Sequence, residues 1–379
     1  MFNIKIIQKL KNIIFPFYKN SDLKFVFKKL QEGSFDQSIS AMFVGGCVRK
    51  HLTNEDIDDI DIATSLTSDQ IKEKFKDTKF KVIDSGIKHG TVTLVKDKLK
   101  LELTTLRRDI KTDGRHAEIE FTDNWLKDSE RRDLTINAIY LDIKGKIYDY
   151  QDGVKDLKVN VVRFIGDPNI RIQEDYLRIL RFLRFAIQYD SNTDFQTIEA
   201  LKLNLNKIKN ISKERVLDEL FKILRLDNFY NILKHKNKKF IFSLIFPELI
   251  NINKIEKLKY FTKTLDKYLI LAILLLDDSN NHEYFCHKYK TSNKVKEELF
   301  LLIKLYNESK ADTGFFKKNI KKNIYFYGIK IIKNLAILKY FDKPKNNLDD
   351  LNEIIKKIDK VSIPKFPYDG SYLKKKGMK

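Results

Sequence analysis

From Phe43 to about Tyr150, the pattern of hydrophobic and polar positions favours β-strands. Segments 91–95 and 99–105 alternate between apolar and polar residues on either side of a short polar stretch, and a second such pair follows at 139–141 and 146–148. Alternation with a period of two, interrupted by turn residues, predicts paired strands. We therefore expect two β-hairpins in this part of the chain.

Two helices interrupt the strand-rich region, and longer helices follow it. One helix is expected directly after Gly46, and another with Ser68 as its N-cap and residues 70–75 as its body. Beyond Asp167-Pro168 the pattern becomes helical, with very little glycine or proline. The sequence thus predicts an α+β part, a mixed sheet with helices, followed by an all-α part.

The composition narrows the class of protein. With 379 residues, of which 42% are hydrophobic, the chain can form two or more structural units. Its two cysteines, Cys47 and Cys286, cannot form a disulfide framework, so we expect a reducing compartment, the cytoplasm. The first twenty residues favour an amphipathic helix over a signal peptide. No apolar run reaches the ~18 residues that span a bilayer, so no membrane partner is expected.

The formal net charge of +21 points to a polyanionic partner, although codon bias can supply much of the lysine. Arginine is more informative, because all 13 arginines lie between Arg49 and Arg225, and a planar bidentate donor suits phosphates and base edges. We therefore expect the chemistry to lie before Arg225. Residues 301–345 carry eleven lysines against three acids, which fits either a phosphate-contacting surface or a merely solvated one.

Asp59-Ile60-Asp61 is the most informative short motif. Side chains alternate between the two faces of a strand, so both carboxylates point one way and Ile60 points into the core. Two oxygen ligands on one strand suit a hard cation such as Mg²⁺. Taken alone, an Asp-x-Asp in so charged a sequence is more often a solvated turn.

Two nearby features strengthen the prediction of a phosphate and metal site. Gly45-Gly46, followed by Val48-Arg49, fits a strand-to-helix turn whose backbone approaches a triphosphate, although most such turns are structural. Glu102 lies on the polar face of its strand. It is either a third carboxylate beside the first two or a partner of lysine in a cross-strand ion pair.

The segment 131–137 places two guanidiniums, a carboxylate and an amide within seven residues, as Arg131, Arg132, Asp133 and Asn137. This combination suits a site for phosphate and ribose hydroxyl groups.

Residues 174–185 are predicted to form a helix in which Asp175 and Arg178 are neighbours at i and i+3. The carboxylate can hold the guanidinium, so that the pair presents an acceptor beside a donor. This pair matches the hydrogen-bonding edges of cytosine and adenine and mismatches those of guanine and uracil. An ordinary amphipathic helix is the alternative.

In this order, the segments resemble the class II tRNA nucleotidyltransferases (CCA-adding enzymes) and the bacterial poly(A) polymerases. The matching positions span about residues 43–225. They are Gly45-Gly46-x-Val48-Arg49, Asp59-x-Asp61, Glu102-x-Thr104-Thr105-x-Arg107-x-Asp109, Asp113-Gly114-Arg115-His116-Ala117, Arg131-Arg132-Asp133-x-Thr135-Ile136-Asn137-Ala138, residues 149–157, and Glu174-Asp175-x-Leu177-Arg178-x-x-Arg181.

The resemblance implies roles for these positions. Asp59 and Asp61 would hold two catalytic Mg²⁺ ions, with Glu102 as a further catalytic carboxylate. Nucleotide binding would fall to Gly45, Gly46, Arg49, Arg132, Asp133, Asn137, Asp175, Arg178, Arg181 and Arg184. The residues Arg107, Asp109 and Arg115 would belong to a flexible loop that helps to admit ATP after two CTPs.

The resemblance also implies a domain order and a reaction. A nucleotidyltransferase palm would occupy residues 1–150 and a base-recognising neck 151–225, and a helical body (226–300) and tail (301–379) would bind tRNA. The expected reaction is template-independent addition of CCA to tRNA 3′ ends from CTP and ATP, with release of pyrophosphate by a two-metal mechanism.

Two other interpretations remain open. A poly(A) polymerase would add AMP to RNA 3′ ends with the same core chemistry, although no Arg-rich stretch follows Asp61. A non-catalytic RNA-binding homologue is conceivable because Lys50 stands where the family usually has Asp. Asp152 likewise replaces a usual glycine. The family's tail pattern recurs at residues 366–370, and a further Gly-rich turn and helix would be expected after it.

Overall fold

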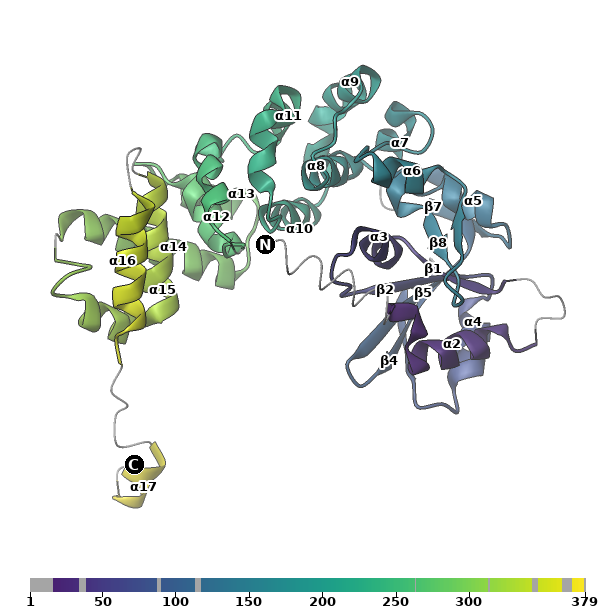
Figure 1. Ribbon diagram of the computed structural model, residues 1–379, viewed down its shortest axis with the longest axis horizontal. Coiled ribbons are helices and arrows are strands. Elements are labelled where there is room, and N and C mark those ends of the chain that lie inside the picture. The colour runs from purple at the N-terminus through teal and green to yellow at the C-terminus, as the bar shows by residue number, and fades with distance from the viewer. Residues whose placement is uncertain are drawn as a thin grey trace. The chain divides into compact units, whose positions relative to one another are not determined.

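The computed structural model describes residues 16–33, 39–86, 90–112, 117–262, 264–312, 314–342, 347–362 and 370–377. The chain divides into two compact units, Met1–Ser212 and Lys213–Lys379 (Figure 1). The amphipathic helix expected in the first twenty residues lies largely outside the described residues, which begin with a short 3-10 turn, η1 (Phe17–Lys19). Arg115 and residues 366–369 of the tail pattern also lie outside them.

A seven-stranded mixed sheet with the order β3-β4-β5-β2-β1-β8-β9 forms the centre of the first unit. Within the described residues, β2 and β5 are the only neighbours in this sheet that pair in parallel, and the other pairs are antiparallel. The β4-β5 and β8-β9 pairs are the two predicted hairpins, and both are confirmed. The strands are β1 (Ala41–Val44), β2 (Ile60–Thr64), β3 (Lys81–Gly86), β4 (Thr91–Lys96), β5 (Leu99–Thr105), β8 (Ile139–Leu141) and β9 (Ile147–Asp149). A separate hairpin consists of β6 (Arg107–Thr112) and β7 (Ala117–Phe121).

The main core lies on one face of this sheet. It joins apolar side chains of the strands to those of α2 (Ser21–Gln31), α3 (Gly46–Thr53) and α4 (Ser68–Phe75). The opposite face carries a smaller cluster around the buried ring of Tyr140. Because side chains alternate along a strand, residues between the core positions of β2 and β5 belong to this second face.

The helix α4 starts one residue differently from the prediction. Thr67, and not Ser68, is its N-cap: the Thr67 hydroxyl accepts from the Gln70 N–H, and the Gln70 side chain accepts from the Thr67 N–H. This reciprocal arrangement satisfies two backbone donors. Ser68 offers the same chemistry, but Gln70 stands three residues after Thr67, which decides the position.

The remainder of the first unit is helical. It contains α5 (Trp125–Glu130), η3 (Thr135–Asn137), α6 (Gly153–Lys158), α7 (Pro168–Glu174), α8 (Arg178–Gln188), α9 (Phe195–Asn204) and η4 (Leu205–Asn210). Asp167 caps α7 and Pro168 is its first residue, so a helix follows Asp167-Pro168 as the change of pattern predicted. Asp152 precedes α6 with a left-handed φ of 57°, a conformation that Asp tolerates better than most residues.

The predicted continuous helix over residues 174–185 is wrong. The helix α7 ends at Glu174, Asp175 is extended with φ −155° and ψ 108°, and α8 begins at Arg178. The Asp175 carboxylate accepts from the Leu177 N–H at 3.1 Å. A side chain that bonds the backbone two residues on offers an alternative to helical hydrogen bonding, which accounts for the break.

The second unit is all-α in its described part, as predicted. Its helices are α10 (Lys213–Leu224), η5 (Phe229–Lys234), α11 (Lys236–Ile245), η6 (Ile252–Tyr260), α12 (Lys267–Leu275), α13 (Asn281–Lys288), α14 (Asn293–Ala311), α15 (Ile320–Asp342), α16 (Leu348–Asp359) and α17 (Gly370–Lys375). Gly328, with φ 79°, kinks α15. None of the helices in the described ranges combines the length and the apolar character needed to cross a membrane.

Candidate active site

The strands β2 and β5 bring two of the predicted carboxylates together. Asp61 lies opposite Glu102 in the register of this parallel pair, while Leu101 and Leu103 are buried on the core face. Asp59 lies one residue before β2 and is exposed, and Ile60 packs against the main core as predicted. Asp61 and Glu102 therefore share the second face of the sheet.

These two carboxylates line a cavity of about 440 Å³, which we call the carboxylate cavity. Its lining residues are Val44, Asp61, Ile62, Gly86, Thr91, Glu102, Thr104, Arg107, Arg131 and Arg132. Three guanidiniums thus face two carboxylates. Guanidiniums bind phosphate oxygens in a fork geometry, and carboxylates bind hard cations, so the cavity can accept a polyphosphate together with its counter-cation.

The carboxylates crowd one another. Burial raises the pKa of Asp61 to about 6, with further contributions from Glu102 and Asp59, although Arg132 and Arg49 oppose the rise. Among the described residues, no group of three or more His, Cys, Asp or Glu side chains is arranged to hold a metal ion by itself. The donor set nevertheless fits a divalent cation, because such an ion would relieve the like-charge repulsion around Asp61.

The alternative interpretation of Glu102, a cross-strand ion pair with a lysine, differs from the contact that the structure contains. The carboxylate lies 3.8 Å from Lys100 of the same strand, and the Glu102 side chain is 46% exposed. The weak, solvated contact leaves the carboxylate of Glu102 open to the cavity.

Gly45 forms the predicted strand-to-helix turn. Its backbone has φ 72° and ψ −123° at the N-cap of α3, a conformation that favours glycine. A Cβ atom at this position would lie 3.8 Å from Nη1 of Arg132 and 3.9 Å from Oδ2 of Asp61. These are ordinary contact distances, so the positive φ, and not a steric clash, is what favours glycine here. The turn places the start of α3 at Gly46 next to a guanidinium and a carboxylate.

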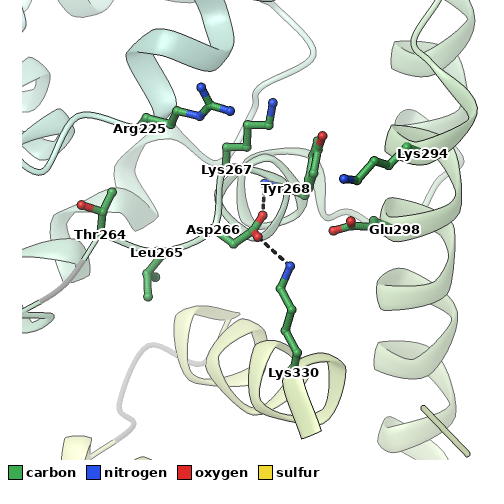
Figure 2. Close-up of a pocket in the computed structure, with 9 residues that line it drawn as sticks. All are labelled: Arg225, Thr264, Leu265, Asp266, Lys267, Tyr268, Lys294, Glu298 and Lys330. Atoms are coloured by element: carbon green, nitrogen blue, oxygen red, sulfur yellow. Dashed lines mark hydrogen bonds and ion pairs between the residues drawn. The ribbon is translucent and has the colours of Figure 1, made fainter. Parts of the chain in front are cut away.

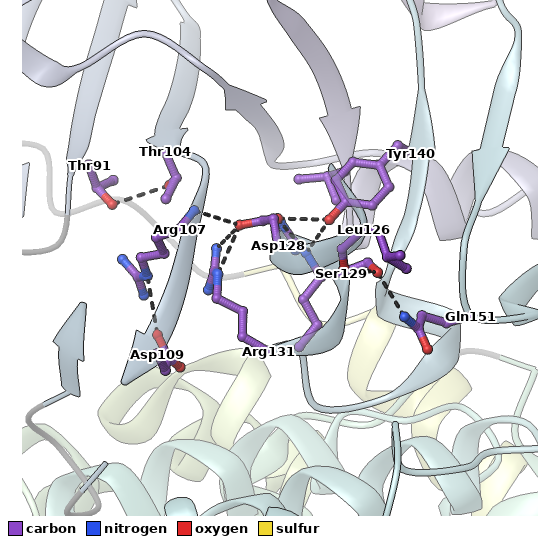
Figure 3. A network of polar contacts seen from close by, with 12 residues as sticks. Thr91, Thr104, Arg107, Asp109, Leu126, Asp128, Ser129, Arg131, Tyr140 and Gln151 are labelled. Carbon is purple, nitrogen blue, oxygen red and sulfur yellow. Dashed lines mark hydrogen bonds and ion pairs between the residues drawn. The ribbon is translucent and has the colours of Figure 1, made fainter. Parts of the chain in front are cut away.

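Asp128, a residue absent from the sequence prediction, organises the arginines of the cavity (Figure 3). Its fully buried carboxylate accepts from Nε of Arg131 at 2.8 Å, Nη2 of Arg132 at 3.0 Å and the Tyr140 hydroxyl at 2.7 Å. It also accepts from the backbone N–H of Arg107 at 3.3 Å. Burial alone would raise the pKa of Asp128, but the two guanidiniums hold it well below its usual range.

Arg107 and Asp109 lie on β6, rather than in the loop between β6 and β7. Both side chains are 18% exposed, and Nε of Arg107 lies 3.8 Å from Oδ1 of Asp109. Burial, followed by repulsion from Arg131, lowers the pKa of Arg107 to about 10. The root of the β6-β7 hairpin thus forms one wall of the carboxylate cavity.

A second network links three elements around Asp133. Its carboxylate accepts from Nε of Arg181 on α8 at 2.6 Å and from Nδ2 of Asn137 on η3 at 3.0 Å. The guanidinium of Arg49 on α3 donates to Oδ1 of Asn137 and lies 4.5 Å from the ring centre of Phe185. Burial would raise the pKa of Asp133, but Arg181 and Asn137 lower it well below the usual range. The segment 131–137 is thereby fixed to α3 and α8.

The predicted pairing of Asp175 with Arg178 needs correction. The Arg178 guanidinium is paired with the Glu174 carboxylate and donates to the Arg171 carbonyl at 3.0 Å. Asp175, extended between the two helices, directs its carboxylate to the Leu177 N–H. On the next turn of α8, the Arg184 guanidinium lies 4.1 Å from the Phe185 ring centre.

Spacing alone could have found Asp128, because it stands three and four residues before the two arginines on a short helix. Nothing in the sequence pattern marks Tyr140, which joins the network through the sheet. Lys50, at the position where the family usually has Asp, is paired with the carboxylate of Asp58.

Comparison with known proteins agrees with this geometry. Residues 41–163 match the Poly A polymerase head domain family, and residues 193–252 match the family described as the Probable RNA and SrmB- binding site of polymerase A. The human mitochondrial CCA tRNA nucleotidyltransferase 1 is 35% identical over 368 residues, which cover 93% of this chain and 81% of that protein.

Two solved structures share the fold. A Bacillus stearothermophilus CCA-adding enzyme in complex with CTP has a TM-score of 0.69 at 24% identity, covering 88% of this chain and 80% of that chain. A tRNA nucleotidyltransferase complexed with a primer tRNA and an incoming ATP analog has a TM-score of 0.63 at 26% identity, covering 86% and 97%.

The mixed sheet, the glycine turn and the cavity of carboxylates and arginines define a nucleotidyltransferase. The extent and identity of the match to the human enzyme show that the chain belongs to the CCA-adding tRNA nucleotidyltransferase family. Enzymes of this kind depend on a divalent metal.

Proposed function

We propose that the protein adds C, C and A to the 3′ end of tRNA, using CTP and ATP and releasing pyrophosphate. The observation that carries this proposal is the carboxylate cavity, where Asp61 and Glu102 face three arginines across a space of about 440 Å³. Relatives named CCA tRNA nucleotidyltransferase and CCA-adding enzyme support the choice of substrates, and so does a tRNA nucleotidyltransferase solved with a primer tRNA and an ATP analog.

We assign the metal to Asp59 and Asp61, with Glu102 as the supporting carboxylate. Mg²⁺, when bound, would lower the pKa of the tRNA 3′-hydroxyl and neutralise charge on the triphosphate. The ionised form of Asp61 is the one that binds a cation, and its pKa of about 6 leaves it ionised at neutral pH. Because burial disfavours the ionised carboxylate of Asp61, a cation bound beside it would stabilise that ionised form.

We assign the triphosphate to the arginines that Asp128 positions, Arg131 and Arg132, with Arg107 beside them. The turn at Gly45 would let the backbone of Gly46 approach the phosphates as a further donor. Pre-formed hydrogen bonds hold these guanidiniums in place before substrate arrives, so little reorganisation is needed as charge develops on the leaving group. The ribose and base would be held by Arg49, Asp133, Asn137, Asp175, Arg178, Arg181 and Arg184.

Base choice would rest on Arg178 and Asp175 at the junction of α7 and α8. Glu174 anchors the Arg178 guanidinium, which leaves the remaining guanidinium donors in a fixed direction. An anchored donor beside a carboxylate can read cytosine and adenine without a template. Asp109 and Arg115 complete the proposed loop that helps to admit ATP.

We place these functions in a palm (1–150), a neck (151–225), a body (226–300) and a tail (301–379), of which the last two would bind tRNA. We also place the protein in the cytoplasm. Cys47 and Cys286 are both buried and form no disulfide, which suits a reducing compartment. The human relative is named as mitochondrial, so cell fractionation is the measurement that checks this location.

An extension assay tests the proposed reaction. tRNAs ending before C, after C and after CC are incubated with CTP, with ATP, or with both, and products are resolved to one nucleotide. We expect CTP alone to extend the first two substrates to CC, and ATP to extend the third by one A. A poly(A) polymerase, suggested by the name of the head family, would ignore CTP and add several A residues. Absence of any incorporation would favour the non-catalytic alternative.

A further inference from the structure

A second cavity, of about 430 Å³, lies within the all-α unit (Figure 2). We call it the basic cavity. The helices α12, α14 and α15 contribute to it, together with the residue after α10 and the segment before α12. Its lining residues are Arg225, Thr264, Leu265, Asp266, Lys267, Tyr268, Lys294, Glu298 and Lys330. Four of them are cationic and two are acidic.

One acid and one cation of the basic cavity already satisfy each other. The carboxylate of Asp266 lies 2.9 Å from Nζ of Lys330 and also accepts from the Tyr268 N–H at 2.9 Å. These contacts outweigh burial and lower the pKa of Asp266. The other charged lining residues are three cations and one acid, Glu298, so the cavity keeps an excess of positive charge.

Lys267 is held in place without being neutralised. Its ammonium lies 4.1 Å from the ring centre of Phe221 and 4.8 Å from that of Tyr268. A cation over an aromatic face is stabilised while its full charge is retained. In Figure 2 the charged ends of Arg225 and Lys267 lie at the same side of the cavity, and Lys294 points in from α14. Like charges brought together in this way repel one another, and a bound anion would relieve that repulsion.

The presence of Arg225 distinguishes this cavity from an ordinary lysine-rich surface. It is the last arginine in the chain, and the 154 residues after it contain none. In a chain that uses lysine so freely, an exposed guanidinium lines this basic cavity. Its two parallel N–H groups match two oxygens of a phosphate.

We propose that the basic cavity binds one phosphate group of the tRNA backbone, with Arg225 as the bidentate donor and Lys267 and Lys294 as supporting cations. The inference rests on the proposed function, because it takes tRNA as the ligand. It adds a defined anchoring point in the second unit, where the sequence indicated only a lysine-rich surface.

The test measures the affinity of the full chain for tRNA as a function of salt. Arg225→Ala should weaken binding about tenfold and reduce the slope of log K against log salt by about 1, the loss of one phosphate contact. Arg225→Lys keeps the charge, so it should retain most of the slope but only part of the affinity. Steady-state CTP addition by Arg225→Ala should show a raised KM for tRNA and an unchanged kcat.

Lys259→Ala is the matched control. It removes one positive charge from the same unit, at a lysine paired with Glu256 at 2.8 Å and outside the cavity lining. We expect its affinity and its slope to match those of the unaltered protein. Equal effects of Arg225→Ala and Lys259→Ala would overturn the inference, because they would indicate a general field rather than a site.

Inorganic phosphate distinguishes a backbone phosphate from a free anion. If the cavity served a free anion, about 10 mM phosphate would raise the melting temperature of the unaltered protein and not that of Arg225→Ala, while tRNA affinity would be equal in the two proteins. That result would overturn the inference. If the unaltered protein neither bound tRNA nor added CTP, the proposed function itself would fail, which is a different outcome.

Discussion

The carboxylate cavity and the basic cavity are of similar volume, about 440 Å³ and 430 Å³, but their charges are held in different ways. In the first, the fully buried Asp128 fixes two guanidiniums, and Asp61 has a pKa raised mainly by burial. In the second, Lys330 is 63% exposed and its contact with Asp266 is solvated. Chemistry requires charges whose positions are fixed in a low dielectric, whereas anchoring of a polyanion requires only cations that water can also reach.

The largest effect that this contrast predicts is at Asp61. Because Asp61→Asn removes a metal ligand, CTP incorporation should fall on the order of a thousandfold or more. The apo protein should become more stable at pH 7.5, by about 3 kcal/mol. Thermal unfolding and single-nucleotide extension measure the two effects.

The direction of this stability change follows from the Asp61 pKa of about 6 in the folded protein. A carboxyl group whose pKa is raised on folding stabilises the folded protein while the group is protonated. This contribution is fully present below the pKa of the unfolded chain, near 4, and it is lost as the pH rises through about 6. Asn stays neutral, so the difference between the two proteins should vanish near pH 4. A loss of stability in Asp61→Asn at pH 7.5 would contradict the prediction. Asp58→Asn is the control: the Asp58 side chain is 71% exposed and pairs with Lys50, so the change should alter activity by less than about twofold.

Asp128→Asn should produce the next largest effect, in both stability and activity. Removing one member of a buried ionic network leaves Arg131 and Arg132 without their counter-charge, which costs about 3 kcal/mol. Loss of their fixed positions should lower kcat/KM for CTP about a hundredfold. Urea unfolding and steady-state kinetics measure these changes.

Tyr140→Phe provides the graded comparison, since it keeps the Asp128 charge and removes only the hydrogen bonds of the Tyr140 hydroxyl, one donated to Asp128 and one accepted from Nε of Arg132. It should cost about 1 to 2 kcal/mol. If both variants retained normal kcat/KM while losing stability, Asp128 would be a structural residue without a positioning role in the site.

These residues also illustrate how far sequence reasoning reaches. The alternating pattern predicts both hairpins, and the period of two places Ile60 in the core and Asp61 on the other face. Asp128 lies within a helical spacing of its arginines, yet its bond to Tyr140 depends on the sheet. The position of Arg107 in the cavity wall depends on where β6 leaves β5. Long-range register of this kind cannot be seen in a local pattern.

The prediction of a continuous helix through Asp175 failed for a different reason. The segment from Glu174 to Phe185 has strong helical periodicity, and Asp175 also suits a helix N-terminus or a local backbone contact. Two local solutions compete, and the contact with the Leu177 N–H wins. Glu174, one residue earlier, consequently takes the partner that the sequence assigned to Asp175.

The smallest predicted effect is at Lys330 in the basic cavity. Lys330→Met removes a solvated ion pair, so the free energy of unfolding should change by less than about 1 kcal/mol. Asp266 would then add an unpaired negative charge beside the proposed phosphate, and tRNA affinity should fall about threefold at low salt, with the difference shrinking as salt rises. Filter binding across a salt series and urea unfolding measure both quantities. If Lys330→Met cost as much stability as Asp128→Asn, the basic cavity would be built on fixed charges as well, and the distinction between a catalytic and an anchoring cavity would be lost.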